Sequence, residues 1–348
     1  MTKNKKKSSS NRLFKNVILF ISGTIIIFLL SYFVGIEDLI TSLKRIPPLV
    51  LIGLFLMQIA TMVMLCFISY KLIKKIIPDL NFKSMWNIHL IVTFVENVTP
   101  GAKIGGEFIK IYLLKKDYAL EYSKLIIAGV VQKFITMTPF IFLSAICLLY
   151  LSKVEGATHF IKISMYVSGA LISMIGIFIL IIIFSNSIKN QRFFLTHINS
   201  ECAIEKNTYF KNMPFLEKKI ESISKISTIT KSFGTINEII FLLSIAFIIW
   251  ILYPIKIYII AHFLGFDIGF ISLTVAVFIA FLIGTVPLFP GGLGTFEATM
   301  AGILTLFGLP LENGIILALI SRTVTFWFPI AFTLIPSLNI LFNLKDKQ

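Results

Sequence analysis

The chain has 348 residues, of which 57% are hydrophobic and 14% are charged, with a mean hydropathy of +0.91. A soluble domain could not bury so much apolar surface, so the composition excludes a soluble globular protein and predicts an all-α, polytopic transmembrane helical bundle. The net charge of +15 has its clearest block in residues 1–16, which we expect to form a basic cytoplasmic tail on the anionic inner leaflet; for residues 1–11 a merely solvated tail fits equally well.

Hydropathy predicts about six full membrane spans, each long enough to cross about 30 Å of hydrocarbon. They are residues 17–34, 49–70, 125–151, 163–184, 236–263 and 313–341. The first is interpreted as an uncleaved span, because it is long for a signal-peptide core and no small-residue cleavage motif follows it.

Two further apolar regions, residues 84–116 and 270–309, are interrupted by TPGAKIGG and FPGGLG. The arms on either side of each break are short for a membrane span. Broken helices at membrane depth are tolerated only where their backbone faces protein or water. Both regions are therefore predicted to be re-entrant helical hairpins.

The distribution of lysine and arginine predicts the orientation of these segments. Loops 71–83, 115–124 and 185–235 carry an excess of basic residues, so they and both termini are expected in the cytoplasm, with loops 152–162 and 264–269 outside. The predicted location is the cell (plasma) membrane, with multiple passes. Residues 215–232 have helical apolar spacing, typical of a helix on the inner leaflet or of an ordinary cytosolic linker helix.

The two breaks share a pattern that predicts an internal repeat. PGAKIGGE ends at Glu107 and PGGLGTFE ends at Glu297. Lys133 and Arg322 follow these glutamates at nearly equal separation along the chain. Each cation is followed by threonine and then by proline, namely Thr136 and Pro139, and Thr325 and Pro329.

The repeat predicts the domain organisation. Three spans separate the hairpins, an odd number, so the second copy should be inverted in the membrane relative to the first. The predicted units are a tail of residues 1–16, a first membrane repeat 17–151 with hairpin 84–116, a second repeat 152–342 with cytoplasmic loop 185–235 and hairpin 270–309, and a cytoplasmic end 343–348.

The breaks also predict a candidate lipid-binding site. Helix N-termini after the breaks would present free N–H groups to an anion, and the glycines would let it approach the backbone. An ionised residue at membrane depth costs about 2.5–3.5 kcal/mol, so we expect the pairs Glu107–Lys133 and Glu297–Arg322. The candidate residues are Asn97, Pro100, Gly101, Lys103, Gly105, Gly106, Glu107, Lys110, Lys133, Pro290, Gly291, Gly292, Gly294, Glu297 and Arg322. The alternative is that the charges are structural ion pairs that hold the broken helices to the long spans.

Other polar residues in the apolar segments receive weaker predictions. Asn97 is expected to cap the turn at the first break rather than to line the cavity. Lys256 is expected to extend its ammonium outward toward water. Glu96, Gln58 and Gln132 are buried polar candidates without assigned partners.

The sequence favours a transporter over an enzyme. It contains no Walker A loop, H-E-x-x-H, G-x-S-x-G or paired metal-binding aspartates, so we predict no catalytic residue, metal or cofactor. Most of the aromatic residues are phenylalanine, which is typical of lipid-facing packing, and no nucleic-acid partner is expected.

At the two breaks the chain resembles a known family. ENVTPGAKIGGEFIKIYLLKK, and PLFPGGLGTFEATMAGILTLFGLP followed by ISRTVTFW, are similar to the signature regions of the lysylphosphatidylglycerol synthase transmembrane region family, also called flippase-like or UPF0104 proteins. The resemblance covers about residues 15–340. It departs in the first signature, where Lys103, Lys110 and Gln132-Lys133 stand at positions that are usually arginine or an E-R pair, which puts the headgroup preference in doubt.

The resemblance implies a lipid-translocating module that acts on a phospholipid or a polyprenyl-phosphate-linked lipid, with a separate lipid-modifying enzyme as a further candidate partner. The 348 residues contain no aminoacyltransferase domain. The leading prediction is a flippase-like protein that moves an anionic or zwitterionic lipid between leaflets. The alternative is a membrane enzyme or enzyme subunit of lipid modification, similar to a phosphatidylglycerol lysyltransferase or a lipid-linked glycosyltransferase.

Overall fold

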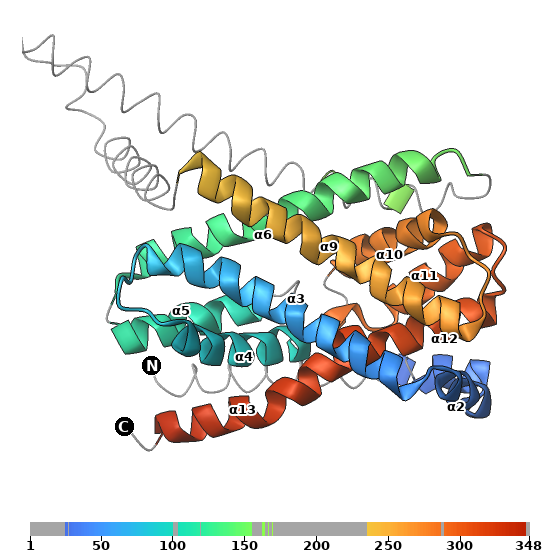
Figure 1. Cartoon of the computed structure of the whole chain (residues 1–348), viewed down its shortest axis with the longest axis horizontal. Coiled ribbons are helices and arrows are strands. Elements are labelled where there is room, and N and C mark those ends of the chain that lie inside the picture. The colour runs from blue at the N-terminus through green and yellow to red at the C-terminus, as the bar shows by residue number, and fades with distance from the viewer. Residues whose placement is uncertain are drawn as a thin grey trace, which may run out of the picture.

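A computed structural model describes residues 25–26, 28–99, 104–118, 120–154, 162–163, 166, 169, 235–286 and 289–345 of the chain. All regular elements within these residues are helical, which confirms the predicted all-α class. The helices form an elongated bundle (Figure 1). In chain order they are α2 (Ile36–Arg45), α3 (Pro48–Lys74), α4 (Phe82–Val98), α5 (Ile104–Tyr118), α6 (Tyr122–Leu151), α9 (Ile236–Leu264), α10 (Phe270–Gly284), η1 (Pro290–Gly292), α11 (Thr295–Leu306), α12 (Leu311–Arg322), η2 (Thr323–Trp327) and α13 (Phe328–Lys345).

Four of the six predicted spans are confirmed by helices that are long and apolar enough to cross a membrane. They are Pro48–Lys74, Tyr122–Leu151, Asn237–Leu264 and Leu311–Leu338. The predicted span 17–34 is described only in its second half, where residues 25–26 and 28–34 are helical. The predicted span 163–184 and the loop 185–235 fall almost entirely outside the described residues, and the tail 1–16 falls wholly outside them.

Local signals explain where the long helices begin and end. Pro48 occupies the first turn of α3, where a missing N–H costs nothing. A capping box between Thr235 and Glu238 starts α9, and Gly265 ends it with a left-handed φ of 74°. The last span changes to π-helix over Thr323–Trp327, directly after Arg322.

The two predicted hairpins are both present as helix, break and helix. Helices α4 and α5 pack against each other, as do α10 and α11. Their lengths are 17, 15, 15 and 12 residues, shorter than the roughly 20 residues that a membrane span requires. In Figure 1 the first hairpin occupies one end of the bundle and the second the opposite end, which matches the predicted inversion.

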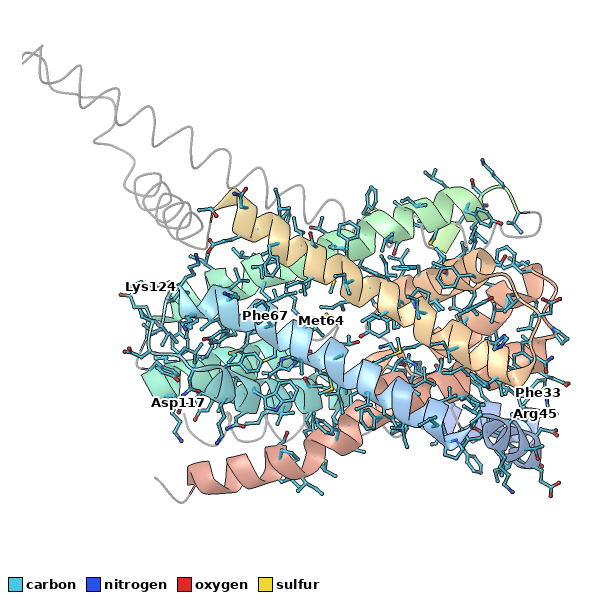
Figure 2. All side chains as sticks on the ribbon, viewed as in Figure 1. Phe33, Arg45, Met64, Phe67, Asp117 and Lys124 are labelled. Carbon is cyan, nitrogen blue, oxygen red and sulfur yellow. The ribbon has the colours of Figure 1, made fainter. Side chains whose placement is uncertain are left out.

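Charged and apolar side chains are segregated along the bundle (Figure 2). Asp117 and Lys124 lie at one end and Arg45 at the other, with Met64 and Phe67 between them. Large apolar side chains on the outer faces are exposed, including Leu56, which is 60% exposed. This arrangement is the one expected of helices whose outer faces contact lipid.

Helix α2 is an element that the sequence analysis did not predict. It follows Gly35, which has a φ of 96°, and its apolar side chains Ile36, Ile40 and Leu43 are exposed. These residues recur at helical spacing, so they share one face. Hydropathy does not reveal α2, because its ten residues are too few to cross a membrane, which takes about 20.

The apolar core has two parts. One surrounds α10, α11 and α12 and includes Phe278 and Phe296; the other surrounds α3, α4, α5 and α6 and includes Ile68 and Met85. Lys256 of α9 is 0% exposed, so the prediction that its ammonium extends outward is wrong. Its position inside the bundle, where Gln58 and Thr61 accept its hydrogen bonds, removes the need to reach water.

Candidate functional site

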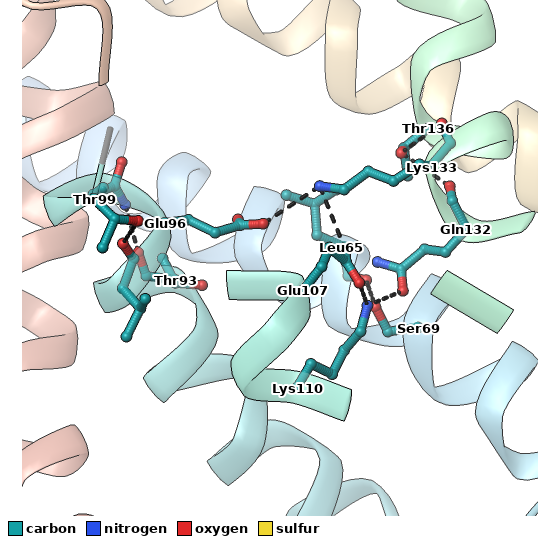
Figure 3. A network of polar contacts seen from close by, with 12 residues as sticks. Leu65, Ser69, Thr93, Glu96, Thr99, Glu107, Lys110, Gln132, Lys133 and Thr136 are labelled. Carbon is teal, nitrogen blue, oxygen red and sulfur yellow. Dashed lines mark hydrogen bonds and ion pairs between the residues drawn. The ribbon is translucent and has the colours of Figure 1, made fainter. Parts of the chain in front are cut away.

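A cluster of four charged side chains lies where the first hairpin meets α6, three of them from the hairpin and one from α6 (Figure 3). Glu107, in the first turn of α5, pairs with Lys110 at 2.5 Å and with Lys133 of α6 at 3.5 Å. Lys133 also pairs with Glu96 of α4 at 3.3 Å, and Lys110 donates to the Gln132 side-chain oxygen at 2.7 Å. The predicted Glu107–Lys133 pair is confirmed. The structure adds Glu96 and Gln132 as partners.

The members of this cluster differ in their access to water. The side chain of Lys110 is 3% exposed, whereas those of Glu96 and Glu107 are 16% exposed and that of Lys133 is 33% exposed. The carboxylates of Glu96 and Glu107 both pair with Lys133, and both distances, 3.3 and 3.5 Å, are long for an ion pair. A cation held in this way can exchange one carboxylate for another anionic partner at small cost.

A cavity of about 60 Å³ lies beside the cluster. Glu96, Glu107 and Lys133 line it from the first repeat, and Trp250 and Tyr253 of α9 line it from the second. The volume is enough for a few water molecules, since one water needs roughly 10–15 Å³ by this kind of measure. The candidate site therefore has a charged wall of Glu96, Glu107 and Lys133 and an otherwise largely apolar lining, and it lies between the first hairpin and α9.

The second hairpin carries a tighter ion pair. Arg322 Nε donates to Glu297 Oε1 at 2.9 Å, and Arg322 Nη2 donates to the carbonyl oxygens of Gly291 and Gly292 at 3.0 and 3.2 Å. The other oxygen of Glu297 accepts from the Gly294 N–H at 2.7 Å. The predicted Glu297–Arg322 pair is confirmed, and these side chains satisfy backbone groups that the break leaves free.

This second pair is closed to solvent. The side chains of Glu297 and Arg322 are 0% and 6% exposed, and the guanidinium lies 4.2 Å from the Phe296 ring centroid and 5.3 Å from that of Phe326. Stacking on aromatic faces and a planar fork of donors suit arginine and not lysine. Here the geometry agrees with the structural alternative, in which the ion pair holds the broken helix to the last span.

The glycines at the breaks face other parts of the protein. A Cβ on Gly106 would collide with the Glu96 side chain, and one on Gly291 would collide with the Phe326 ring. Gly291, Gly292 and Gly294 also have positive φ angles of 60°, 68° and 80°, which favour glycine. Close packing and backbone conformation thus explain these glycines, and a role in headgroup approach stays a prediction.

Glycines 105 and 129 have related roles. A Cβ on Gly105 would collide with Thr99 at the end of α4, and one on Gly129 would lie 3.1 Å from Glu107 Oε2. Sequence reasoning did not single out Gly129. Its position one turn before Lys133 was the available signal, because that position faces the same neighbour.

The remaining predicted residues contribute in different ways. Asn97 donates to the Thr93 carbonyl of its own helix at 2.8 Å and is not among the residues that line the cavity. The backbone of Pro290 begins η1. Pro100, Gly101 and Lys103 lie outside the described residues.

The second break lies against the helix that leads to the first break. Segment η1 of the second break contacts α4, the helix that leads to the first break. Tyr253 of α9 lines the cavity beside the first cluster. The arrangement is that of two broken helices meeting inside a helical membrane protein.

The repeat also extends to side-chain bonding after each cation. Thr136 Oγ1 donates to the carbonyl of Gln132 at 3.0 Å, and Thr325 Oγ1 donates to that of Ser321 at 2.9 Å. In both copies a proline follows, and proline removes a backbone donor. In the second copy the π-helical turn directly precedes Pro329.

The fold and the site define a polytopic helical membrane protein with two opposed broken-helix hairpins. Residues 17–332 match the family described as "Lysylphosphatidylglycerol synthase TM region", and the chain belongs to this family.

Curated relatives include membrane proteins of archaea. A UPF0104 membrane protein of Methanothermobacter thermautotrophicus is 22% identical over 316 residues, covering 90% of this chain and 92% of its own. UPF0104 membrane proteins of Pyrococcus horikoshii and Methanocaldococcus jannaschii are 21% and 23% identical, covering 95% and 96% of this chain and 98% and 97% of theirs. No solved structure matches the chain.

Proposed function

We propose that this protein moves an anionic or zwitterionic phospholipid between the two leaflets of its membrane. The observation that carries the proposal is the cavity between the first hairpin and helices α3, α6 and α9, where Glu96, Glu107 and Lys133 form a charged wall. Ionisable side chains at membrane depth are costly and commonly mark a substrate or ion path. A lipid headgroup could place its phosphate against Lys133 and its polar substituents against Glu96 and Glu107.

Lys133 is the residue that we expect to contact the phosphate. It has the most exposed side chain of the cluster, and its ion pairs with Glu96 and Glu107 are longer than the Arg322–Glu297 pair. The protein's own glutamates occupy the first turns of α5 and α11, so the headgroup would meet Lys133 and not the helix N-termini.

The cavity must enlarge for this role. Its volume of about 60 Å³ is far below the roughly 300–1,000 Å³ of typical ligand sites. We therefore infer that the described conformation is a closed one. Opening would require the first hairpin to move against α6 and α9, because those helices supply the opposite wall.

The proposed location is the cell membrane with both termini in the cytoplasm. Support comes from the basic end of α3, where Lys71 and Lys74 lie in the last turn and Lys75 follows it, and from Lys115 and Lys116 at the end of α5. The connections on the opposite side of the bundle contain few basic residues, as in loop 264–269. The partners under this proposal are the membrane lipids and the anionic inner leaflet.

A second candidate function is a subunit of a lipid-modifying enzyme. Its support is the family description, which names a lysylphosphatidylglycerol synthase. In that case the cavity would hold the lipid for a separate enzyme, and lipid movement by the isolated protein would be absent.

Reconstitution into liposomes tests the proposal. The purified protein is inserted into vesicles that contain phosphatidylglycerol with a fluorescent acyl chain, and a membrane-impermeant quencher reports how fast lipid reaches the outer leaflet. We expect faster movement than in protein-free vesicles and a loss of that gain in Lys133→Gln. Lys83→Gln serves as the matched control, since Lys83 is exposed and outside the cluster.

Two results would count against the proposal. Movement equal to that of protein-free vesicles refutes translocation of this lipid, and repetition with a fluorescent polyprenyl phosphate extends the test to the other lipid class. Wild-type activity in a correctly folded Lys133→Gln protein refutes the assigned role of Lys133.

A further inference from the structure

A third buried cation lies near the two clusters and takes no part in either. Lys256 of α9 is 0% exposed, and its ammonium donates to Gln58 Oε1 at 2.5 Å and to Thr61 Oγ1 at 3.3 Å. The ammonium also lies 4.3 Å from the ring centroid of Tyr253. It precedes the end of α9 at Leu264 by about 12 Å at 1.5 Å per residue, which places it deep in the bundle.

Lys256 lacks a carboxylate partner among the described residues. Ion pairs there join Glu96 and Glu107 to Lys133, Glu107 to Lys110, Glu297 to Arg322, and Glu238 to Lys75. An uncompensated charge at membrane depth is costly. That cost disappears when the amine gives up its proton.

The groups around Lys256 suit both of its charge states. The Gln58 amide offers an oxygen that accepts from an ammonium and a nitrogen that, after rotation of the amide, can donate to a neutral amine. The Thr61 hydroxyl can likewise accept or donate. A carboxylate in their place would favour the charged state alone. The site can therefore gain or lose a proton without leaving a buried polar atom unpaired.

Tyr253 connects this site to the cavity. Its ring contacts the Lys256 ammonium, its side chain also hydrogen-bonds with Gln58, and it lines the cavity beside the first cluster. Besides the Lys256 ammonium, Glu96 and Arg322 act electrostatically on the Tyr253 hydroxyl. Any movement of the hairpins that hydrates the cavity thus brings water to the neighbour of Lys256.

The helices that pack on α9 bring few other titratable groups. Helix α3 presents the neutral Gln58 and Thr61 to Lys256, and its titratable side chains begin five residues beyond Thr61, at Cys66. Helix α10 has no titratable side chain, and α9 itself carries Glu238 in its first turn and His262 in its last. Helix α6 brings the ion-paired Lys133, and α12 brings Glu312 in its first turn and the ion-paired Arg322. The charges of α2 lie in its first and last turns: Glu37, Asp38, Lys44 and Arg45.

We propose that Lys256 is a proton-binding site coupled to the lipid movement of the cavity, an inference that rests on the proposed function. The Nζ lone pair takes a proton from water on one side of the membrane when the cavity is open to that side. The same N–H bond breaks, and the proton returns to water, when the cavity opens to the other side. A proton gradient then drives the lipid step.

The first experiment measures proton binding without any lipid movement. Trp86 and Trp327 are changed to Phe, which leaves Trp250, whose ring centroid lies 5.5 Å from that of Tyr253. The fluorescence of this purified protein is followed from mildly acidic to mildly alkaline pH. We expect a transition that is lost when Lys256→Gln is added. A transition that persists with Lys256→Gln, or none in either protein, overturns the proposal.

The second experiment measures coupling in the liposomes described above. An imposed proton gradient should accelerate lipid movement by the wild-type protein and by Lys83→Gln. Lys256→Gln cannot take a proton and Lys256→Arg cannot release one, so both should lose the response to the gradient. Lipid movement that is equal with and without the gradient in the wild type overturns the coupling.

The two experiments separate this inference from the proposed function. If no lipid moves under any condition, the proposed function fails and coupling fails with it. The fluorescence transition then still decides whether Lys256 binds a proton.

Discussion

Replacing Arg322 should destabilise the protein far more than replacing Lys133, although the repeat places the two cations at equivalent positions. Arg322→Ala leaves the fully buried carboxylate of Glu297 without its cation and removes the donor to two carbonyl oxygens. Breaking a buried pair by removing one partner costs about 3–5 kcal/mol.

Lys133→Ala should cost much less. The Lys133 side chain is 33% exposed, and its pairs with Glu96 and Glu107 are 3.3 and 3.5 Å long. Water in the adjacent cavity can solvate both carboxylates, so we expect a loss of about 1 kcal/mol or less, as for solvent-exposed pairs.

Thermal unfolding in detergent, followed by intrinsic fluorescence, provides the comparison. Arg322→Ala should lower the midpoint strongly, and Lys133→Ala only slightly. The double change Glu297→Gln with Arg322→Met should be more stable than Arg322→Met alone, because it removes the unpaired charge. Equal midpoints for the two alanine variants, or no rescue in the double variant, would show that the second pair does not hold the hairpin in place.

Two other predictions follow from the same geometry. Gly106→Ala should separate α4 from α5, because its Cβ would collide with the Glu96 side chain, and it should lower both the unfolding midpoint and lipid movement; unchanged values would mean that the hairpin tolerates a wider spacing. In a protein without its native cysteines, Asp79→Cys should react with an impermeant thiol reagent only from the cytoplasmic side and Asp267→Cys only from outside. Labelling of both from one side of intact cells would refute the proposed topology.

Much of the fold follows from local properties of the sequence. Hydropathy and length predict the four long spans, because a bilayer imposes both on any helix that crosses it. The breaks at PGAKIGG and FPGGLG predict the hairpins, because proline and several glycines close together disfavour a continuous helix. The internal repeat predicts the pairs Glu107–Lys133 and Glu297–Arg322, because buried charges need partners and the chain offers few.

The outcome for individual polar residues depended on packing between helices. Glu96 and Gln132 are recognisable in the sequence as buried polar groups, yet their partners come from other helices, and the register between helices is not encoded locally. Lys256 illustrates the same limit. The side chain of a lysine in a membrane span normally extends toward the aqueous interface. Here the packing of α3 against α9 places Gln58 and Thr61 within hydrogen-bond distance of the Lys256 ammonium.

The sequence by itself determined the class of the protein, its two broken hairpins and the charges that pair across them, because each depends on the order of residues along one segment. The tertiary structure decided that the equivalent ion pairs are unequal. Phe296 and Phe326 enclose Arg322, whereas Lys133 borders a cavity. That difference depends on which side chains of distant helices surround each pair, and so on how the whole bundle packs.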